Sequence, residues 1–360
     1  MPKITSVGVC VPPHALTQTT TVEFAREMFE DSFKDISRLL TVFENGQIKK
    51  RNFAKNLEWF KEDHTFEDRN NAYIEHAVEY SLEAIKNCLS NDEYLSESVP
   101  YEEIEAIFFI STTGISTPSI DAKIMNHLPF SPHTKRIPIW GLGCAGGAAG
   151  LSRAYDYCLA YPNAKVLVVS VELCGLTFQK NDRSKSNLIG TSLFADGVAA
   201  VLVAGNEVKG LNNTSIPFIQ ATQSTLMPDS EDVMGWDIKN EGLYVIFSKD
   251  IPNIITEWLK PNVEKFLHEN GLELSDIKHF IAHPGGKKVI QAYEDSLGFT
   301  QHHTKHSQTI LQEYGNMSSA TVYYVLNEFM KEDIPDGEYG IIAALGPGFS
   351  SELLLVKWGI

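Results

Sequence analysis

The stretch Trp140-Gly-Leu-Gly-Cys-Ala-Gly-Gly-Ala-Ala-Gly150 is apolar, rich in glycine, and carries one thiol near its centre. A helical pattern at 151–159 follows it. A cysteine at the start of a helix faces unpaired backbone N–H groups and the positive end of the helix dipole. Both favour the nucleophilic thiolate, so Cys144 is a candidate nucleophile, and the small residues around it would let the backbone approach a reacting carbonyl group. The alternative is a buried structural cysteine, because free cysteine packs as a small hydrophobic residue.

The composition describes an acidic chain with large hydrophobic cores. It has 360 residues, 43% of them hydrophobic, which is enough for two domains. The formal net charge of −16 argues against a broad surface for nucleic acid or anionic membranes. Five cysteines, an odd number without a Cys-x-x-Cys pair, fit a reducing compartment. No apolar run approaches the ~18 residues of a membrane span, so we expect a cytoplasmic protein.

The two halves of the chain repeat one pattern. The runs 104–114 and 277–286 are both apolar strands that end in small or polar residues, as strands buried on both faces do. Gly143-Cys-Ala-Gly-Gly-Ala-Ala resembles Gly315-Asn-Met-Ser-Ser-Ala-Thr, and each is followed by a helix and then by a strand at 165–171 or 340–344. This register places the cysteine opposite the asparagine.

The repeat predicts an α/β fold built from two β-α-β-rich halves, 1–205 and 216–360, packed about a pseudo-twofold axis. The turn-rich segment 205–216 is the expected boundary. Periodicity and loop composition add further elements. Helices are expected at 21–45, 70–90, 119–128, 250–270 and 288–297, and a polar loop at 179–187.

Strand ends and helix starts from both halves should converge at one site, since ligands of open α/β sheets bind there. Cys144 from the first half would then meet His283 and Asn316 from the second. An imidazole can activate a thiol, and an imidazole N–H and an amide N–H can together hold the oxygen of a thioester enolate. Taken singly, a buried histidine is as readily a satisfied polar residue and the asparagine a helix N-cap.

At these residues the chain resembles the type III polyketide synthases, the chalcone-synthase-like branch of the thiolase-fold condensing enzymes. The resemblance extends over nearly the whole chain. It is carried by Trp140-Gly-Leu-Gly-Cys-Ala-Gly-Gly, Leu193-Phe-Ala-Asp-Gly, Ile281-Ala-His-Pro-Gly-Gly, Tyr314-Gly-Asn-Met-Ser-Ser-Ala and Leu345-Gly-Pro-Gly-Phe.

The resemblance implies a thiolase-like fold with αβαβα layers and a division of labour at the site. Cys144 would take the starter acyl group from coenzyme A, while His283 and Asn316 would bind malonyl-CoA and stabilise the enolate left by decarboxylation. The family acts as a homodimer on coenzyme A thioesters, without an acyl carrier protein, metal ion or bound cofactor. Further substrate-binding positions that it implies are the aromatic gatekeeper Phe194, Thr177, Gly190, Val245, Trp236, Ser318 and the loop Gly346, Pro347 and Gly348, which shapes the cavity floor.

Several positions depart from the plant chalcone synthases. Val245 stands where those enzymes have a second gatekeeper phenylalanine, Trp236 where they have glycine, and Thr117 where they have the methionine that crosses the dimer. The changed aromatic positions argue against a flavonoid product. The pattern is most similar to bacterial alkylpyrone synthases, which extend long fatty acyl-CoA starters with malonyl-CoA to alkylpyrones or alkylresorcinols.

The basic residues that hold coenzyme A phosphates in plant relatives are only partly present. Arg38 matches one of them, while Thr41 and Asn45 replace the other two. We expect nearby basic residues to substitute. The candidates are Lys49, Lys50, Arg51, Lys287 and Lys288.

Other readings of the same residues make distinct predictions. A papain-like protease also uses Cys, His and Asn in that order, but near its N-terminus and in a secretory context. A ketoacyl synthase III-like or hydroxymethylglutaryl-CoA synthase-like enzyme shares the fold and the cysteine, and a binding-only relative would lack the reactive thiol. Finally, His302, His303 and His306 have metal-ligand spacing, but no acidic residue lies among them, and we expect a solvated loop.

Overall fold

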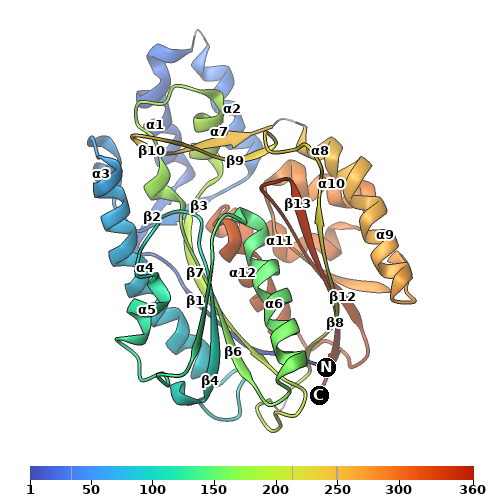
Figure 1. The fold of residues 1–360 in the computed structure, drawn as a ribbon. Helices are drawn as coiled ribbons and strands as arrows, with labels where there is room; N and C mark the ends of the chain where they lie inside the picture. Colours follow the sequence, from blue (N-terminus) through green and yellow to red (C-terminus); the bar gives the residue numbers. More distant parts are fainter. Residues whose placement is uncertain (34, 213, 249) are drawn as a thin grey trace.

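The computed structural model describes residues 1–33, 35–212, 214–248 and 250–360. In this part of the chain one sheet of nine strands runs through the molecule, in the order β11-β12-β13-β8-β1-β7-β6-β4-β5 (Figure 1). The strands are β1 (Lys3–Cys10), β4 (Ile104–Ile110), β5 (Lys135–Ile139), β6 (Lys165–Leu173), β7 (Asp196–Ala204), β8 (Ile216–Leu226), β11 (Ile277–Ala282), β12 (Tyr339–Gly346) and β13 (Ser350–Gly359). The strand β4, which is buried except at Glu105, pairs in parallel with β5 and β6, and β11 pairs in parallel with β12.

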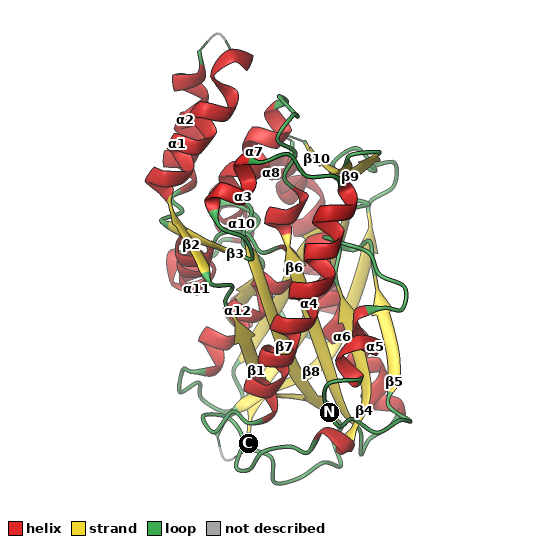
Figure 2. Ribbon diagram, turned by 90° about the vertical axis from the view of Figure 1, so that its left-hand side faces the viewer, coloured by secondary structure: helices red, strands yellow, loops and turns green. Residues whose placement is uncertain are grey.

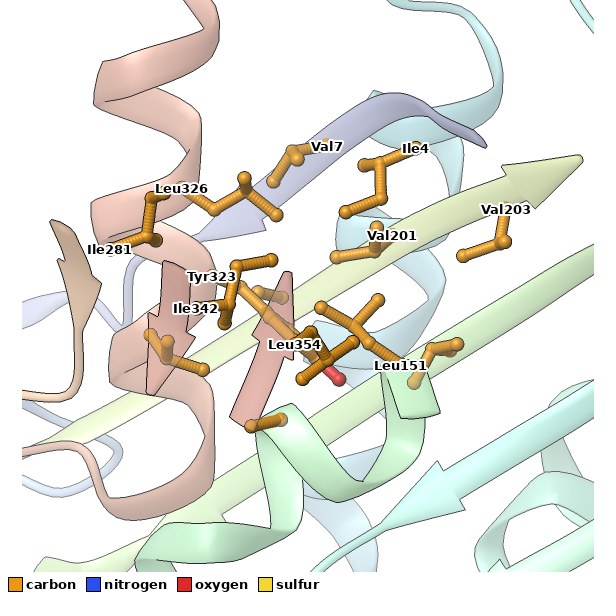
Figure 3. Packing of buried hydrophobic residues seen from close by; sticks show 14 of the residues in the cluster. Ile4, Val7, Leu151, Val201, Val203, Ile281, Tyr323, Leu326, Ile342 and Leu354 are labelled. Carbon is orange, nitrogen blue, oxygen red and sulfur yellow. The ribbon is translucent and has the colours of Figure 1, made fainter. Parts of the chain in front are cut away.

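Two helices form the central layer. The helices α6 (Gly146–Ala160) and α12 (Thr321–Met330) share one hydrophobic core with strands from both arms of the sheet (Figure 3). Leu151 of α6 and Leu326 of α12 lie in this core beside Val201 of β7 and Leu354 of β13. The sheet therefore wraps around the two helices, and its β8-to-β11 arm faces its β1-to-β5 arm across them.

The outer faces of the two arms carry their own helices. The first arm packs its outer face on α4 (Phe66–Leu89) and α5 (Ile120–Met125), and the second on α9 (Lys260–Glu269) and α10 (Lys287–Leu297). Alternate residues of β6 point to opposite faces of the sheet. Val166 and Val168 lie in the central core, while Leu167 and Val169 lie in the outer core that α4 covers. These layers confirm the expected αβαβα architecture.

Smaller elements gather at one end of the sheet, where α1 and α2 stand away from the body of the molecule (Figure 2). They include two antiparallel sheets of two strands each, β2–β3 and the hairpin β9–β10. Their bounds are β2 (His14–Thr17), α1 (Gln18–Phe29), α2 (Ile36–Gly46), β3 (Lys50–Phe53), α3 (Leu57–Lys61), α7 (Lys185–Leu193), β9 (Met234–Lys239), β10 (Gly242–Phe247) and α8 (Ile251–Ile254). A π-helical turn, Ile255–Leu259, joins α8 to α9, so the helix expected at 250–270 is interrupted. No helix within the described ranges is long and apolar enough to cross a membrane.

Two expectations about local structure are wrong. The pattern at 21–45 is two helices, because Asp35 accepts a hydrogen bond from the N–H of Arg38 and starts α2 as a separate helix. The expected loop at His302, His303 and His306 lies in α11 (Gln301–Tyr314), whose start is fixed by reciprocal bonds between Thr300 and His303. Among the described residues, no group of three or more His, Cys, Asp or Glu side chains could hold a metal ion.

Candidate active site

Cys144 lies in a 3₁₀ turn, Gly143–Ala145, that leads directly into α6. Glycines in this turn and at the start of α6 allow the two halves of the chain to pack closely. A Cβ at Gly147 would lie 2.3 Å from the carbonyl oxygen of Ser319, and one at Gly143 would lie 2.6 Å from Cδ of Pro347. The small residues were expected to admit a substrate carbonyl group, but here they admit protein segments from the second half.

The corresponding turn of the second half, Ser318–Ala320, leads into α12 in the same way. Its first residue, Ser318, has φ +47, and the first residue of the cysteine turn, Gly143, has φ +48. The structural register therefore pairs Cys144 with Ser319. The sequence register, which placed Cys144 opposite Asn316, is wrong by three residues, because it matched small residues rather than the point at which each turn begins.

Asn316 is nevertheless linked to Cys144 indirectly, through Ser318. The Cys144 thiol donates to Oγ of Ser318 at 3.5 Å, and the N–H of Ser318 donates to Oδ1 of Asn316 at 2.8 Å. Nδ2 of Asn316 donates to the carbonyl oxygen of Gly285 at 3.1 Å, which orients the amide and leaves its second N–H without a protein partner in the described chain.

His283 follows β11, and its backbone N–H donates to the carbonyl oxygen of Ala343 on β12 at 2.8 Å. It stands two residues before Gly285, the residue that holds the Asn316 amide. Its side chain is 2% exposed, and within the described chain neither Nδ1 nor Nε2 has a hydrogen-bond partner. A buried imidazole with both nitrogens unpaired is a costly feature that a substrate atom could relieve.

Burial shifts the pKa values of both Cys144 and His283. It raises the pKa of Cys144 to about 12, although the neighbouring side chains of Ser318 and Asn316 act in the opposite direction. Burial also lowers the pKa of His283 to about 3. Both shifts favour the neutral thiol and the neutral imidazole, so desolvation opposes the thiolate that the helix dipole favours.

A buried carboxyl group that the sequence analysis missed lies behind the second turn. Glu172 on β6 accepts hydrogen bonds from the N–H and Oγ1 of Thr112, at 3.0 and 2.9 Å, and from Oγ of Ser319. Burial raises the pKa of Glu172 to about 7. An acidic residue inside the apolar run Lys165–Leu173 was the available signal, since such residues are rarely buried without partners.

The loop Gly346, Pro347 and Gly348 packs directly on the cysteine turn. A Cβ at Gly346 would lie 2.5 Å from the carbonyl oxygen of Leu142, and Pro347 lies over Gly143. The loop therefore supports the nucleophile. It was expected at a cavity floor, but none of its three residues lines the apolar cavity described next.

An apolar cavity lies beside this site. Its lining includes five expected substrate-binding residues, Thr177, Gly190, Phe194, Trp236 and Val245. It also includes residues from the first 60 positions and from 174–191 that were not anticipated. These are Leu16, Thr21, Phe24, Arg51, Phe53, Leu57, Phe60, Cys174, Gly175, Phe178, Asn187 and Thr191.

Several polar side chains of the cavity wall are turned toward the backbone. Oγ1 of Thr177 donates to the carbonyl oxygen of Cys174 at 2.7 Å, and Oγ1 of Thr191 donates to that of Asn187 at 2.7 Å. The Thr21 hydroxyl and the Asn187 amide also donate hydrogen bonds to backbone carbonyl oxygens. The wall therefore presents mainly hydrocarbon and aromatic surface.

Phe194 connects the cavity with the polar site. It pairs with Asn316 in an isolated parallel β-bridge, and its ring lies 5.5 Å from that of Phe247 and 6.1 Å from that of Trp236. The Trp236 indole is held in turn by a 2.9 Å bond from its N–H to the carbonyl oxygen of Thr112. The gatekeeper position thus stands between the Asn316 turn and the cavity.

The basic residues proposed for coenzyme A separate into two groups. Arg38, Lys50 and Lys288 are exposed, and Lys49 is exposed but forms an ion pair with Glu313 at 2.9 Å. Arg51 is 1% exposed and donates to the carbonyl oxygens of Thr191 and Phe194. The assignment of Arg51 to a surface phosphate contact is therefore wrong, because neighbouring residues of strand β3 point to opposite faces.

Known proteins of one family match this sequence over almost its whole length. A family model for the N-terminal domain of chalcone and stilbene synthases matches residues 2–207, and one for the C-terminal domain matches 218–358. A putative chalcone synthase of Bacillus subtilis is 55% identical over 99% of this chain and 98% of its own length. An alpha-pyrone synthesis polyketide synthase-like protein of Mycobacterium tuberculosis is 28% identical, with 98% and 90% covered.

Among solved structures, the 1,3,6,8-tetrahydroxynaphthalene synthase of Streptomyces coelicolor superposes with a TM-score of 0.90 at 30% identity, covering 99% of both chains. That structure is described as a bacterial type III polyketide synthase. The chain therefore belongs to the chalcone and stilbene synthase family and is a type III polyketide synthase, a decarboxylating, condensing acyltransferase.

Proposed function

We propose that this enzyme loads a long-chain fatty acyl group from coenzyme A, extends it with malonyl-CoA, and cyclises the product to an alkylpyrone or alkylresorcinol. The observation that carries the proposal is the apolar cavity beside Phe194, which is lined mainly by hydrocarbon and aromatic side chains, as small-molecule sites are. Because the cavity wall offers hydrocarbon and spends its hydroxyl groups on backbone carbonyls, it suits an alkyl chain better than a hydroxylated ring.

In the proposed loading step, Cys144 Sγ attacks the acyl-CoA carbonyl carbon. The thiol proton passes to the neutral His283 imidazole and then to the departing coenzyme A thiolate. Burial moves the pKa of His283 to about 3, which weakens the imidazole as a base. The proposed proton transfer therefore accompanies formation of the bond between Sγ and the carbonyl carbon.

In the proposed extension step, the malonyl thioester loses carbon dioxide and leaves an enolate. The free N–H of Asn316 and an N–H of His283 would hold the enolate oxygen, while Gly285 keeps the Asn316 amide in place. The enolate carbon attacks the acyl carbonyl on Cys144, and sulfur leaves. Each step uses groups of this chain alone, so we propose that no metal ion, bound cofactor or acyl carrier protein takes part.

The surface supports two further parts of the proposal. Exposed Arg38, Lys50 and Lys288 are proposed to contact the coenzyme A phosphates. The edge strand β5 pairs only with β4 in the described sheet, and Ile115 and Trp140 are 49% and 48% exposed. We propose that this edge forms a homodimer, since unpaired edges and exposed apolar residues mark interfaces. A cytoplasmic location stays a prediction.

A second candidate is a naphthalene synthase that builds its product from malonyl units alone. The similarity to the Streptomyces coelicolor enzyme favours it. Such an enzyme would need polar groups facing its product, and the hydroxyl groups of Thr21, Thr177 and Thr191 are spent on the backbone. The long-chain proposal is therefore preferred.

The test is a panel of starters from acetyl-CoA to stearoyl-CoA, with coumaroyl-CoA, each supplied with malonyl-CoA and analysed by mass spectrometry. We expect pyrones or resorcinols from long-chain starters at the highest kcat/KM, without added carrier protein. Preference for coumaroyl-CoA, a product from malonyl-CoA alone, or dependence on carrier protein would each overturn the proposal.

A matched pair of variants locates the alkyl chain. A Cβ at Gly190 would point into the cavity, 3.3 Å from Val245 and 3.5 Å from Phe194, whereas one at Gly46 would meet no atom within 4 Å. Gly190→Leu should shift the preferred starter to shorter chains, because it fills the cavity. Gly46→Leu should leave the preference unchanged. An unchanged preference in both variants would exclude this cavity as the alkyl site.

A further inference from the structure

Arg51 is a buried cation in the wall of the apolar cavity, and none of the proposed chemical steps uses it. It extends from β3 into the interior and is 1% exposed. Among the described residues no carboxylate pairs with it, and its Nε and Nη2 have no hydrogen-bond partner. Burial lowers the pKa of Arg51 to about 9, so the side chain remains a cation at neutral pH. A charge held this way destabilises a fold unless its remaining contacts compensate.

Those contacts lie at the end of α7. Nη1 of Arg51 donates to the carbonyl oxygen of Thr191 at 2.5 Å and to that of Phe194 at 2.9 Å. Thr191 is in the last turn of α7 and Phe194 is its C-terminal cap. The last carbonyl groups of a helix lack partners within the helix, and its C-terminal end carries partial negative charge. The guanidinium group therefore acts as the cationic cap of this helix.

The same side chain lies against the turn that carries Asn316. A Cβ at Gly315 would approach Cγ and Cδ of Arg51 to 2.7 and 2.8 Å, so the arginine stem occupies the space beside that glycine. The two segments that Arg51 touches are also bonded to one another. The N–H of Asn316 donates to the carbonyl oxygen of Leu193, and the N–H of Ala195 donates to that of Asn316, both at 2.9 Å.

We propose that Arg51 is a positioning residue for chain extension, which holds the end of α7 against the Gly315–Asn316 turn and so sets the Asn316 amide and the Phe194 ring together. The inference rests on the proposed function, because it assigns Asn316 to the malonyl step. The proposal predicts different effects on the two half-reactions. In the described chain no hydrogen bond joins Arg51 to Cys144 or to the turn that carries it, so loss of Arg51 should affect chain extension and not acylation of the cysteine.

The test compares Arg51→Met, Arg51→Lys and the control Arg153→Met in the full-length enzyme. Arg153 pairs with Glu352 away from the site, so its loss should lower stability without altering the kinetics of the folded enzyme. Two rates are measured separately: acylation of the cysteine by acetyl-CoA, whose chain is too short to fill the cavity that Arg51 lines, from the mass of the intact protein, and carbon dioxide release from malonyl-CoA.

In Arg51→Met we expect acylation within about twofold of the wild-type rate and malonyl decarboxylation lowered at least tenfold in kcat, with Arg51→Lys partly restored because it keeps one donor and the charge. Equal rates in Arg51→Met and Arg153→Met would overturn the inference, as would an equal loss in both half-reactions. If Arg51→Met does not fold, Arg51→Lys decides by the same two rates. A wild-type enzyme that neither acylates nor decarboxylates would instead reject the proposed function itself.

Discussion

The turn before α6 and the turn before α12 have nearly the same backbone but different uses. Each begins with a residue in the left-handed region, Gly143 at φ +48 and Ser318 at φ +47, and each leads into a central helix. In the first turn a Cβ would overlap the Pro347 ring, so any residue other than glycine would force a local shift. In the second, the serine side chain is accommodated and reaches the Cys144 thiol.

This difference shows how a repeated backbone acquires two roles. The first half contributes the nucleophile and otherwise small residues, while the second contributes polar side chains, Asn316, Ser318 and Ser319. Because the two turns pack against each other, the small residues of one make room for the polar residues of the other. A substitution in the first turn should therefore affect a different reaction step, or a different property of the protein, from a substitution in the second turn.

The largest expected effect is that of Cys144→Ala. Condensation should fall to background, because no acyl group can be held on the enzyme. Malonyl-CoA decarboxylation should continue, since the proposed enolate site belongs to the second half. Product analysis and carbon dioxide release measure the two activities. Full chain extension by this variant would show that another group carries the acyl chain.

The second effect is that of Asn316→Ala, which removes the donor from the other turn. We expect malonyl decarboxylation to fall by ~10²–10³, the usual cost of one such donor, with acylation of the cysteine almost unchanged. Asn316→Asp is the control for turn geometry, because it keeps the oxygen that accepts from Ser318 but loses the N–H donor. Wild-type decarboxylation by Asn316→Asp would contradict the role of the amide.

The third effect concerns the carboxyl group behind the second turn. Burial raises the pKa of Glu172 from 4.5 to about 7, so the folded protein retains a proton that the unfolded chain releases. The stability from this group is complete below pH 4.5 and is lost as the pH rises through 7, by about 3 kcal/mol in total. Glu172→Gln should lack this loss.

Urea unfolding of wild type and Glu172→Gln at pH 5 and pH 8 measures that difference. Asp196 is also buried with a raised pKa of about 7, but it is present in both proteins and cancels in the comparison. A wild-type protein that gains stability relative to Glu172→Gln between pH 5 and pH 8 would show that the carboxyl group is ionised in the folded state at the lower pH.

The smallest effect compares the first residues of the two turns. Gly143→Ala should lower the free energy of unfolding by about 1–3 kcal/mol, because the new Cβ overlaps Pro347 and the φ value is unfavourable. Ser318→Gly should stay within about 1 kcal/mol of wild type, because relief of backbone strain is offset by greater freedom of the unfolded chain. Thermal denaturation measures both, and the reverse order would show that the two turns are not equivalent in backbone.

Sequence reasoning reached the layered architecture, the start of α6 at Cys144 and the buried strands β4 and β11. It missed the helix α11, because His302 and His303 read as polar loop residues while the buried face of the helix begins only at Thr304. It also missed the cavity wall from the first 60 residues. Those residues line the cavity only because the fold brings α1, β3 and α3 to the same cavity as α7, which no local pattern reports.

The amino-acid sequence by itself determined the kinds of elements and the kinds of reactive groups, because periodicity, turn residues and side-chain chemistry are local properties. Only the tertiary structure decided how deeply these groups are buried and which protonation state is favoured. Packing by distant segments shifts the pKa values of Cys144 and His283 toward their neutral forms, and Arg51 is a buried helix cap rather than a surface cation because it bonds the end of α7. Burial is a property of the whole fold, so protonation and placement could not be read from neighbouring residues in the chain.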